Sequence, residues 1–451
     1  MQACPGGSDE DGEMKRTYPS EDKPPLCLEP IDGLRGSTTV PGDKSISHRA
    51  LILGALSSGT MKVRNLSPGE DVRSTWQCLE QLGIGIEAVG EEVKLEGRAQ
   101  GALREPEDVL DVGNSGTTMR LLAGVLAAQP VFSILTGDAS LRRRPMDRIV
   151  KPLRQMGAEI RGRENGRLAP LAIRGGGLSP IRYDSPIASA QVKTALLLAG
   201  LSLQGETSLT EPTPSRDHTE RMLRYMGADV ICDEGAILLR GGRTIEAKDI
   251  AVPGDPSSAA FLVVAALITS RSELEIREVC VNPTRIGYLK ILERMGASVK
   301  RSRSREVCGE PVADLTIRSS GLTGTTLHRE EVPGCIDEIP VLCVAAAFAE
   351  GTTRITGAEE LRVKESDRIA AMASNLSGMG VNVTERPDGL EIEGRGRVEA
   401  FEGQSWKDHR IALSLIVAAL AAEGPSRIFG GDCMDVSYPN FLEQISPLIE
   451  R

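Results

Sequence analysis

One phrase built around a glycine recurs five times in this chain of 451 residues, and it constrains the fold more than any other feature. The phrase glycines stand at positions 83, 157, 227, 296 and 380, so they are spaced 74, 70, 69 and 84 residues apart. Each phrase closes an amphipathic helical pattern, turns at its glycine and enters an extended segment. Repetition of such a segment indicates equivalent supersecondary units of the βα type. The phrases are Gln81–Ile86, Gln155–Ile160, Tyr225–Val230, Arg294–Val299 and Gly378–Val383.

The two ends of the chain together predict a sixth unit. A helical pattern runs from Tyr438 to Ile449 without a strand after it, and an extended pattern at residues 26–40 could supply that strand. We therefore expect the two ends to belong to one domain, in a chain that is long enough for two or three domains. The first twenty-five residues are rich in Gly, Asp, Glu, Ser and Pro, which predicts a disordered tail at 1–25.

A second echo marks the boundary between two domains. Pro41–Ser45 is matched by Pro253–Ser257, and each segment precedes an apolar helical pattern. We interpret them as the two strands that cross between domains, with three units on each side. The expected fold class is α/β, with two similar domains and a site in the cleft between them. The predicted divisions are an inserted domain at 43–254, a domain at 26–42 plus 255–451 that contains both chain ends, and a hinge at 41–44 and 252–256.

Cations stand at the start of several predicted helices, where they are electrostatically unfavourable. A helix N-terminus already carries roughly half a positive charge, so an added Lys or Arg predicts a bound anion. A solvated, capped helix start is the alternative for any single case, but five such starts make coincidence a weak explanation. They come from both predicted domains, and we expect them to meet in the cleft. The starts are Asp43–Arg49, Asn114–Arg120, Ser189–Lys193, Val363–Arg368 and Lys407–Arg410.

The overall charge balance is acidic, with a formal net charge of −10. This balance argues against a general nucleic-acid binder, which needs a basic surface, and an aromatic content of 3% offers no base-stacking platform. The cations described above are local exceptions in an acidic background. That contrast favours a focused site for a small polyanion.

Cysteine usage and hydropathy bear on the compartment and the partners. The nine cysteines are odd in number and include no Cys-x-x-Cys pair, which argues against a disulfide framework or a zinc ribbon and favours a reducing cytoplasm. We therefore expect no metal site. No uninterrupted apolar stretch approaches the length of a membrane span, so we expect no membrane partner.

Six motifs of this chain resemble the signatures of the 5-enolpyruvylshikimate-3-phosphate synthase family. They are, in order, Pro41–Arg49, Gly113–Arg120, Arg144–Met146, Ser189–Lys193, Leu361–Arg368 and Asp408–Arg410. The resemblance covers the chain from about residue 30 to about residue 445. It implies two domains, each of three βαβαββ units, that close on the substrates. The repeat independently suggests the same number of units.

The resemblance also implies an activity. Members of this family transfer the enolpyruvyl group of phosphoenolpyruvate to the 5-hydroxyl of shikimate 3-phosphate, through a tetrahedral ketal intermediate, and release phosphate. The two substrates carry two phosphates and two carboxylates, which matches the predicted need for anions. The resemblance implies no metal or organic cofactor. The expected partners are the two substrates, with glyphosate as a candidate inhibitor, and we expect a monomer.

The resemblance assigns roles to residues that match the family's motifs. Asp337 matches the proton acceptor for the 5-hydroxyl, Glu365 matches the proposed proton donor to the methylene carbon, and Lys44 is assigned contacts to both substrates. The shikimate 3-phosphate set is Lys44, Ser45, Arg49, Ser189, Ala190 through its backbone, Gln191, Arg216, Asp337 and Lys364. The phosphoenolpyruvate set is Lys44, Gly116, Arg144, Gln191, Glu365, Arg368 and Arg410.

Ordinary structural interpretations stay open for some of these residues. Gly116 could be a turn glycine, and Arg216 could form a surface ion pair with Asp217. Asp337 could cap the helical run that begins near Ile339.

The segment around Glu365 carries two further expectations. Lys364 and Arg368 are four residues apart, which predicts that they share a helical face. Between these two cations the carboxyl group of Glu365 should have a low pKa. Glu365 can therefore act as a proton donor only if burial or ligand charge raises that pKa. The division of labour between Glu365 and Asp337 stays open at this point.

The chain departs from the best-known members of the family at a few positions. Val436 stands where many members carry a lysine near phosphoenolpyruvate, and Leu121 stands where those members often have proline. With Ala190 in the Ser-Ala-Gln motif, these departures resemble the second class of the family, which includes glyphosate-tolerant enzymes. Gly116 is nevertheless the residue usual in sensitive enzymes, so the response to glyphosate stays open.

Two other functions compete with this interpretation. The related enolpyruvyl transferase that acts on UDP-N-acetylglucosamine typically has Lys-Asn where this chain has Lys44-Ser45, and it has a loop cysteine that no cysteine here clearly matches. A non-catalytic polyanion-binding protein on the same scaffold would keep the arginines and lose the carboxylates. Asp337 and Glu365 are both present, which favours an enzyme.

Overall fold

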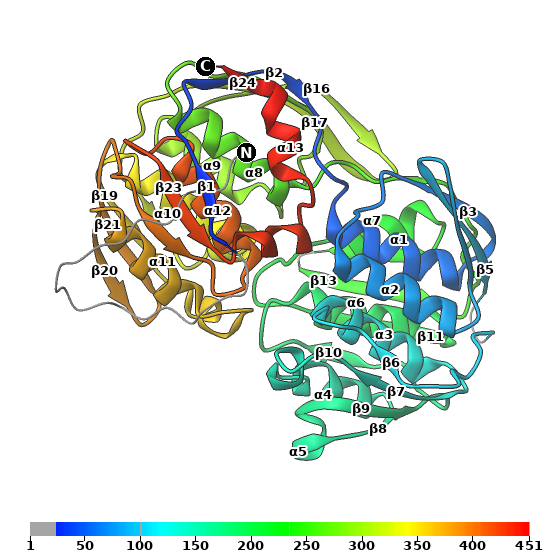
Figure 1. Ribbon diagram of the computed structural model, residues 1–451. Helices are drawn as coiled ribbons and strands as arrows, with labels where there is room; N and C mark the ends of the chain where they lie inside the picture. Colours follow the sequence, from blue (N-terminus) through cyan, green and yellow to red (C-terminus); the bar gives the residue numbers. More distant parts are fainter. Residues whose placement is uncertain (1–23, 100–101, 234, 451) are drawn as a thin grey trace.

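The computed structural model describes residues 24–99, 102–233 and 235–450. The predicted tail at 1–25 lies almost wholly outside these residues. The described chain forms six small sheets with helices between them (Figure 1), of which four have four strands, one has five and one has three. The α/β fold class predicted from the repeat is confirmed.

Three units form the half of the chain between the two crossover segments. The first comprises α1 (Lys44–Leu56), β3 (Ser58–Arg64), α2 (Glu70–Gln81), β4 (Gly85–Val89), β5 (Glu92–Arg98) and β14 (Ile250–Ala251). The second comprises β6 (Leu110–Asp111), α3 (Gly116–Ala128), β7 (Phe132–Thr136), η1 (Leu141–Arg143), α4 (Asp147–Gln155), β8 (Glu159–Gly162), α5 (Arg163–Gly166) and β9 (Leu168–Arg174). The third comprises β10 (Arg182–Asp184), α6 (Ala190–Leu201), β11 (Gly205–Thr210), α7 (His218–Tyr225), β12 (Asp229–Asp233) and β13 (Ala236–Gly241).

Three more units form the other half. The fourth comprises β2 (Gly33–Thr38), α8 (Pro256–Ile268), β15 (Glu273–Cys280), α9 (Gly287–Arg294), β16 (Ser298–Val307), β17 (Glu310–Arg318) and β24 (Ile449–Glu450). The fifth comprises β18 (Thr326–Leu327), η2 (Val332–Gly334), α10 (Ile339–Ala347), β19 (Glu350–Ile355), η3 (Glu359–Val363), α11 (Arg368–Gly378), β20 (Asn382–Arg386) and β21 (Gly389–Arg395). The sixth comprises β22 (Glu402–Gln404), α12 (His409–Ala419), β23 (Ser426–Phe429), η4 (Gly431–Val436), α13 (Phe441–Ile445), η5 (Ser446–Leu448) and β1 (Leu26–Leu28).

The four-stranded sheets share one strand order. They read β14-β3-β5-β4, β6-β7-β9-β8, β10-β11-β13-β12 and β18-β19-β21-β20. In each, the first two strands are parallel and the remaining pairs are antiparallel. The repeated glycines end the second helix of their units with φ between 77° and 106°. Because residues with a Cβ rarely adopt this conformation, the need for a glycine C-cap explains the repeated phrase.

The chain ends complete two different sheets, which corrects the prediction of a single strand at 26–40. Strand β1 pairs antiparallel with β23, whereas β2 lies parallel to β15 in the neighbouring sheet. The predicted helix from Tyr438 to Ile449 is also shorter, since α13 ends at Ile445 and a 3₁₀ turn follows. Pro447 lies in this turn, and proline lacks the backbone N–H that a continuing helix requires.

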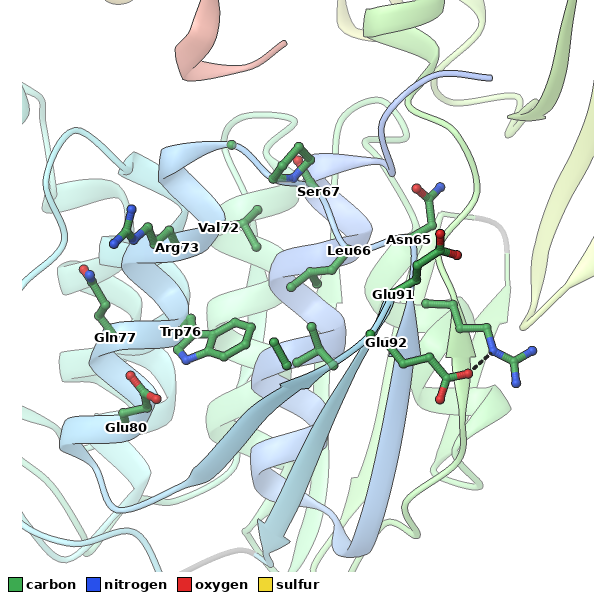
Figure 2. A pocket seen from close by; sticks show the side chains of 16 residues that line it. Asn65, Leu66, Ser67, Val72, Arg73, Trp76, Gln77, Glu80, Glu91 and Glu92 are labelled. Carbon is green, nitrogen blue, oxygen red and sulfur yellow. Dashed lines mark hydrogen bonds and ion pairs between the residues drawn. The ribbon is translucent and has the colours of Figure 1, made fainter. Parts of the chain in front are cut away.

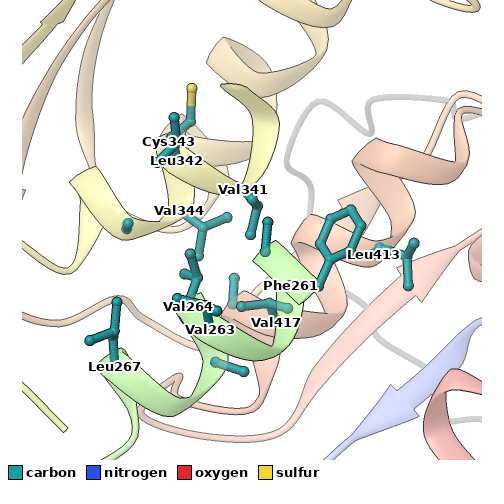
Figure 3. Packing of buried hydrophobic residues seen from close by; sticks show 14 of the residues in the cluster. Phe261, Val263, Val264, Leu267, Val341, Leu342, Cys343, Val344, Leu413 and Val417 are labelled. Atoms are coloured by element: carbon teal, nitrogen blue, oxygen red, sulfur yellow. The ribbon is translucent and has the colours of Figure 1, made fainter. Parts of the chain in front are cut away.

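The first helix of each unit is buried over most of its length. Because α8, α10 and α12 carry apolar residues on all sides, each can be covered completely by its neighbours. Figure 3 shows these three helices packed together. Phe261, Val341 and Leu413, one from each helix, belong to the cluster of buried residues there. The equivalent helices α1, α3 and α6 are buried in the other half.

The buried apolar side chains separate into two clusters. One is built from residues between 46 and 252 together with Cys280, and the other from residues at 28–40 and 259–448. This separation supports the domain boundaries at 43–254 and 26–42 plus 255–451, which we keep as a proposal. Figure 1 shows β1 and β24, the first and last strands of the described chain, on the half that contains α8 and α12.

The two crossover segments lie against each other between the halves. Gly42 and Gly254 form an antiparallel bridge, in which Asp43 N–H donates to Pro253 O at 2.8 Å and Asp255 N–H donates to Pro41 O at 2.8 Å. A Cβ on Gly42 would lie 1.8 Å from the carbonyl oxygen of Asn65, so only glycine fits there. The echoed Pro-Gly-Asp phrases therefore reflect a close backbone contact at the crossing.

Candidate active site

A cavity of about 640 Å³ lies between the two halves. Its lining includes thirteen of the fourteen candidate site residues named from the sequence, and Arg49 is the exception. Those thirteen are Lys44, Ser45, Gly116, Arg144, Ser189, Ala190, Gln191, Arg216, Asp337, Lys364, Glu365, Arg368 and Arg410.

The repeat explains why these residues converge. The first, buried helix of every unit begins at the cavity, because residues at or just before the N-termini of α1, α3, α6, α8, α10 and α12 all line it. Six equivalent helix N-termini therefore point their unpaired N–H groups and positive dipole ends toward one space. Four of the five predicted cationic starts bring a cation to this cavity, from both halves, whereas Lys193 of the Ser189–Lys193 start does not line it.

The chain itself supplies part of the negative charge that the helix starts require. Asp43, Asp367 and Asp408 cap α1, α11 and α12 with their carboxylates. Ser115 and Ser189 cap α3 and α6 with hydroxyl groups instead. The expectation of a bound anion at every start is therefore too broad, and it applies best to α3 and α6, whose caps are neutral.

Ion pairs cross the cavity from one half to the other. Nη1 of Arg144 lies 3.4 Å from Oε1 of Glu365. Nη1 of Arg148, one turn further along, lies 3.0 Å from Oε1 of Glu360. These contacts link the two halves across the cavity.

Asp337 lies at the centre of a group of cations. Its Oδ2 lies 2.5 Å from Nη2 of Arg216 and 3.8 Å from Nη2 of Arg410, and its Oδ1 lies 3.7 Å from Nη1 of Arg368. Burial alone would raise the pKa of Asp337, but the charges of Arg410, Arg216, Lys364 and Arg368 outweigh it and hold that pKa well below its usual range. Asp337 is therefore ionised in this structure.

Two alternative interpretations of these residues are now excluded. Asp337 does not cap α10, because Glu338 occupies the cap position and makes no side-chain cap hydrogen bond. Arg216 does not pair with Asp217, whose carboxylate lies 2.7 Å from Nε of Arg221.

Glu365 is the second carboxylate in the cavity. Its Oε2 accepts a hydrogen bond from Nη2 of Arg368 at 2.6 Å. Burial would raise the pKa of Glu365, but the charges of Arg368 and Arg144 outweigh it and keep the pKa well below its usual range. The low pKa expected from the sequence is confirmed, although Arg144 from the other half replaces Lys364 as the second cation.

The helix after Glu365 begins later than predicted. Asp367 is the N-cap of α11, so Arg368 is the first helical residue, and Lys364 precedes the helix as the C-cap residue of η3. The prediction that Lys364 and Arg368 share a helical face is therefore wrong. The side chains still meet the same cavity, where Nζ of Lys364 lies 3.8 Å from Oε1 of Glu360. The carboxylate of Asp367 accepts a hydrogen bond from Ala370 N–H, and this N-cap bond fixes the start of the helix at Arg368.

Arg368 is almost completely buried, with its side chain 2% exposed. Its Nε donates to Oδ2 of Asp408 at 2.8 Å. Since Asp408 also caps α12, this pair fixes the guanidinium beside the start of that helix, where Arg410 lies. Arg410 in turn donates from Nη1 to the carbonyl oxygen of Asp337 at 3.0 Å.

Lys44 lies at the first turn of α1 and joins three segments. Its Nζ lies 2.8 Å from Oδ2 of Asp71 on α2, and its backbone N–H donates to Oδ2 of Asp255 at 3.1 Å. Asp71 and Asp255 both line the cavity, and neither was identified from the sequence as a site residue. The ammonium group is therefore held at the cavity wall by a carboxylate from the neighbouring helix.

Further cations of the site were missed by the sequence analysis. Arg120, Arg148, Arg285 and Arg329 all line the cavity. Arg120 belongs to a quoted motif, so its place there was the available signal, whereas Arg285 and Arg329 lie outside every motif. Burial, together with the positive charges of Arg144 and Arg148, lowers the pKa of Arg120 to about 10.

Gly116 faces a protein group rather than open space. A Cβ built at Gly116 would lie 2.9 Å from Nη1 of Arg120 and 3.4 Å from Nη1 of Arg144. Nη1 of Arg120 is itself engaged, since it donates to Oε1 of Gln191 at 2.7 Å. The absence of a side chain at this position therefore leaves room for two guanidinium groups. Its φ is unexceptional, so the turn-glycine interpretation is not needed.

Arg49 lies below the cavity instead of on its surface. Its guanidinium donates to Thr219 Oγ1 at 2.7 Å, to Thr194 Oγ1 at 2.9 Å and to the carbonyl oxygen of Ser45 at 2.8 Å. In this arrangement Arg49 reaches the site only through Ser45.

Of the residues that set this chain apart from the best-known members, Ala190 lines the cavity, whereas Val436 and Leu121 lie outside its lining. Val436 ends η4, and its carbonyl oxygen packs 2.8 Å from the position that a Cβ on Gly69 would occupy. Leu121 is buried within α3.

A second cavity, of about 1030 Å³, is larger but lies within one unit. It lies between α2 and the strands β3, β4 and β5, with Trp76 on one wall (Figure 2). Its two arginines are Arg64 and Arg73, and Arg64 already pairs with Glu92 at 2.7 Å. Because size alone does not bind a dianion, we assign the chemistry to the smaller, charged cavity.

The described residues offer neither a metal-binding cluster nor a membrane-spanning helix. Those residues contain no group of three or more His, Cys, Asp or Glu side chains arranged to hold a metal ion. Within the same residues, none of the helices combines the length and the apolar character needed to cross a bilayer.

Comparison with known proteins agrees with this geometry. The family model described as EPSP synthase (3-phosphoshikimate 1-carboxyvinyltransferase) matches residues 28–445. A 3-phosphoshikimate 1-carboxyvinyltransferase of Synechococcus sp. (strain JA-3-3Ab) is 54% identical over 428 residues, which is 94% of this chain and 96% of the relative. The enzyme of that name from Geobacter metallireducens is 53% identical over 424 residues, or 94% of this chain and 98% of the relative.

Solved structures agree as well. EPSP synthase from Acinetobacter baumannii superimposes with a TM-score of 0.86 at 45% identity, covering 95% of this chain and 98% of that chain. The enolpyruvyl transferase NikO from Streptomyces tendae has a TM-score of 0.76 at 18% identity over 95% and 98% of the two chains, which shows the shared fold alone. With its family model, its relatives and its cavity in agreement, this chain belongs to the EPSP synthase (3-phosphoshikimate 1-carboxyvinyltransferase) family.

Proposed function

We propose that this chain performs the reaction of its family with the residues of the interdomain cavity. The reaction transfers the enolpyruvyl group of phosphoenolpyruvate to the 5-hydroxyl of shikimate 3-phosphate and releases phosphate, a step of the shikimate pathway to aromatic amino acids. The observation that carries the assignment of residues is the cavity itself, in which cations from both halves surround the carboxylates of Asp337 and Glu365.

Phosphoenolpyruvate is bound by the guanidinium groups of Arg144, Arg368 and Arg410, next to Gly116. Planar guanidinium groups match carboxylate and phosphate oxygens in pairs. Arg120 adds a further cation beside Gly116, and Lys44 and Gln191 contact both substrates. In the free protein these cations contact protein carboxylates. When the substrates bind, substrate oxygens replace part of those contacts.

Shikimate 3-phosphate is bound at the starts of α1 and α6 and by the loop before α7. Ser45, Ser189 and Arg216 provide hydroxyl and guanidinium groups, while Ala190 provides its backbone N–H. A helix N-terminus with a neutral serine cap, as in α6, suits a phosphate or a carboxylate. Lys364 and Asp337 reach the same substrate from the other half.

The chemistry needs a proton acceptor and a proton donor. Asp337, ionised in this structure, accepts the proton of the 5-hydroxyl while that oxygen bonds to C2 of phosphoenolpyruvate. Glu365 donates a proton to C3, which completes the tetrahedral intermediate. Loss of a proton from C3 and of phosphate from C2 then restores the double bond of the enol ether.

Substrate charge reconciles these roles with the low pKa values. In the free protein, the cations around Glu365 favour its ionised form. When substrate phosphate and carboxylate groups occupy the same cations, the pKa of Glu365 rises because its stabilising partners are shared. A carboxylate that is ionised in the free protein then becomes able to carry a proton in the complex.

A phosphate-release assay with both substrates tests the function, and turnover in D₂O tests the roles. We expect phosphate release that requires both substrates, with no turnover when a UDP-sugar replaces shikimate 3-phosphate. We also expect the Glu365→Gln variant to lose deuterium incorporation at C3 of phosphoenolpyruvate. Full incorporation in that variant would reject Glu365 as the donor.

Three narrower proposals accompany this function. Glyphosate competes with phosphoenolpyruvate at Gly116 and Arg120, to be measured by repeating the assay with the inhibitor. The chain works as a monomer, to be checked by sedimentation. It acts in a reducing compartment such as the cytoplasm, a proposal supported by six cysteines of the described residues that form no disulfide, namely Cys78, Cys232, Cys280, Cys308, Cys335 and Cys343.

A further inference from the structure

A buried ion cluster lies beneath the cavity, between α6 and α7. Nζ of Lys193 lies 3.1 Å from Oε2 of Glu211 and 2.8 Å from Oε1 of Glu220, and no side chain of the three is more than 4% exposed. Lys193 belongs to the Ser189–Lys193 motif, where the sequence analysis counted it among the cations that await an anion. Its charge is already neutralised by these two carboxylates, and Lys193 is not among the residues that line the cavity.

Glu211 connects this cluster to two segments of the cavity wall. Oε1 of Glu211 accepts a hydrogen bond from the backbone N–H of Ser189 at 3.0 Å. The same carboxylate accepts from the hydroxyl of Ser215 at 2.7 Å and from its backbone N–H at 3.3 Å. One carboxylate thus receives three hydrogen bonds from the wall and an ion pair from below.

Each of these segments carries a residue proposed above to bind shikimate 3-phosphate. Ser189 is the N-cap of α6, and Ser215 directly precedes Arg216. The two segments are far apart in sequence, and both are anchored to the residue that follows β11. Glu211 therefore links Ser189 directly to Ser215, and Lys193 adds a hydrogen bond from its Nζ to the carbonyl oxygen of Ser215 at 3.3 Å.

We propose that Glu211, charge-balanced by Lys193, is a positioning residue that holds Ser189 and Arg216 at the spacing required by shikimate 3-phosphate. This inference rests on the proposed function. Glu211 does not touch the substrate, so it acts on affinity through the two segments that it holds. Lys193 makes the buried carboxylate tolerable, since an unpaired charge in this environment would be strongly destabilising.

Glu220 provides a matched control within the same cluster. Its Oε1 pairs with Lys193 as Glu211 does, but its Oε2 has no hydrogen-bond partner among the described residues, and no hydrogen bond links it to Ser189 or Ser215. A change from carboxylate to amide at either position removes one buried charge beside Lys193. Only the change at Glu211 directly alters the hydrogen bonds that Ser189 and Ser215 donate to a carboxylate.

The test compares Glu211→Gln and Glu220→Gln in the full chain, with steady-state kinetics for each substrate and thermal unfolding. We expect Glu211→Gln to raise KM for shikimate 3-phosphate about tenfold, which corresponds to the loss of one or two hydrogen bonds, with kcat and KM for phosphoenolpyruvate nearly unchanged. Both variants should lower the unfolding temperature by similar amounts, because each removes one buried charge beside Lys193. Glu220→Gln should leave KM for shikimate 3-phosphate unchanged. Equal KM values in the two folded variants would overturn the proposal.

Two further measurements keep the result decisive. If Glu211→Gln does not fold, Ser215→Ala removes one hydroxyl donor to Glu211, and a severalfold rise in KM for shikimate 3-phosphate is expected, while an unchanged KM overturns the proposal. The unmodified chain is assayed alongside. An inactive unmodified chain rejects the proposed function and this inference with it, whereas an active chain with unaffected variants rejects only the positioning role of Glu211.

Discussion

Arg216 and Asp337 meet across the interdomain cavity, with Nη2 of the arginine 2.5 Å from Oδ2 of the aspartate. Arg216 precedes α7 in one half of the chain, and Asp337 precedes α10 in the other. The proposed catalytic carboxylate is therefore neutralised partly by a residue of the opposite half. Closure of the two halves therefore contributes to the low pKa of Asp337, because Arg216 adds to the charges of Arg410, Lys364 and Arg368 from the half that contains Asp337.

Replacement of Asp337 by alanine should abolish turnover while leaving shikimate 3-phosphate bound. Loss of a general base is expected to reduce kcat by about 10²- to 10⁴-fold. Binding should persist because Arg216 and Lys364 remain. Phosphate release measures the first effect and titration calorimetry the second. Undiminished kcat would remove Asp337 from its assigned role.

Replacement of Gly116 by alanine should weaken phosphoenolpyruvate binding by displacing Arg120. The new Cβ would lie 2.9 Å from Nη1 of Arg120, so that guanidinium must move and give up its hydrogen bond to Gln191. We expect KM for phosphoenolpyruvate to rise about tenfold, in line with the cost of overpacking. The matched control is Gly321→Ala, because a Cβ there meets no atom within 4 Å. Similar kinetics in the two variants would contradict this prediction.

Stability should fall at acid pH, in part through Glu365. Its pKa is lower in the folded chain than its usual value near 4.3, so its ionised form stabilises the fold above that pH. The contribution is lost as the pH falls through the lower, folded value. Urea midpoints measured from neutral pH downward should decline less steeply in Glu365→Gln than in the unmodified chain. The exposed Glu87→Gln serves as the control, and it should follow the unmodified curve.

The ion pair between Arg148 and Glu360 should assist closure in a salt-dependent way. The two side chains are 34% and 46% exposed, so their attraction is worth less than about 1 kcal/mol. We expect Glu360→Ala to raise KM for both substrates about two- to threefold without changing kcat. The difference should disappear at about 1 M salt, where screening is nearly complete. Lys151→Ala removes a pair within α4 alone and should have no effect on either KM.

Local sequence was sufficient to predict the repeated architecture. Each glycine phrase requires a positive φ at a helix end, and each buried first helix requires an unbroken apolar run, so both features are visible within a few residues. The same local signals located the helix starts that line the cavity. The resemblance of the motifs then identified thirteen residues of its lining.

Contacts between distant segments decided the rest. Lys193 has the sequence position of an anion-binding cation, yet it pairs with Glu211 and Glu220, which lie on other segments. Lys364 precedes its helix because the carboxylate of Asp367 caps the backbone first. Arg285 and Arg329 reach the cavity from segments with no recognisable motif.

The sequence by itself therefore determined the six units, the positions of their helix starts and the family, because these depend on backbone conformations and residue types that act over short distances. Only the tertiary structure decided which cations remain for substrates and which are neutralised within the protein. That outcome depends on carboxylates brought near by folding, such as Glu211 beneath Ser189 and Asp337 opposite Arg216. Coulomb energies vary with distance and burial, and neither quantity can be read from separations along the chain.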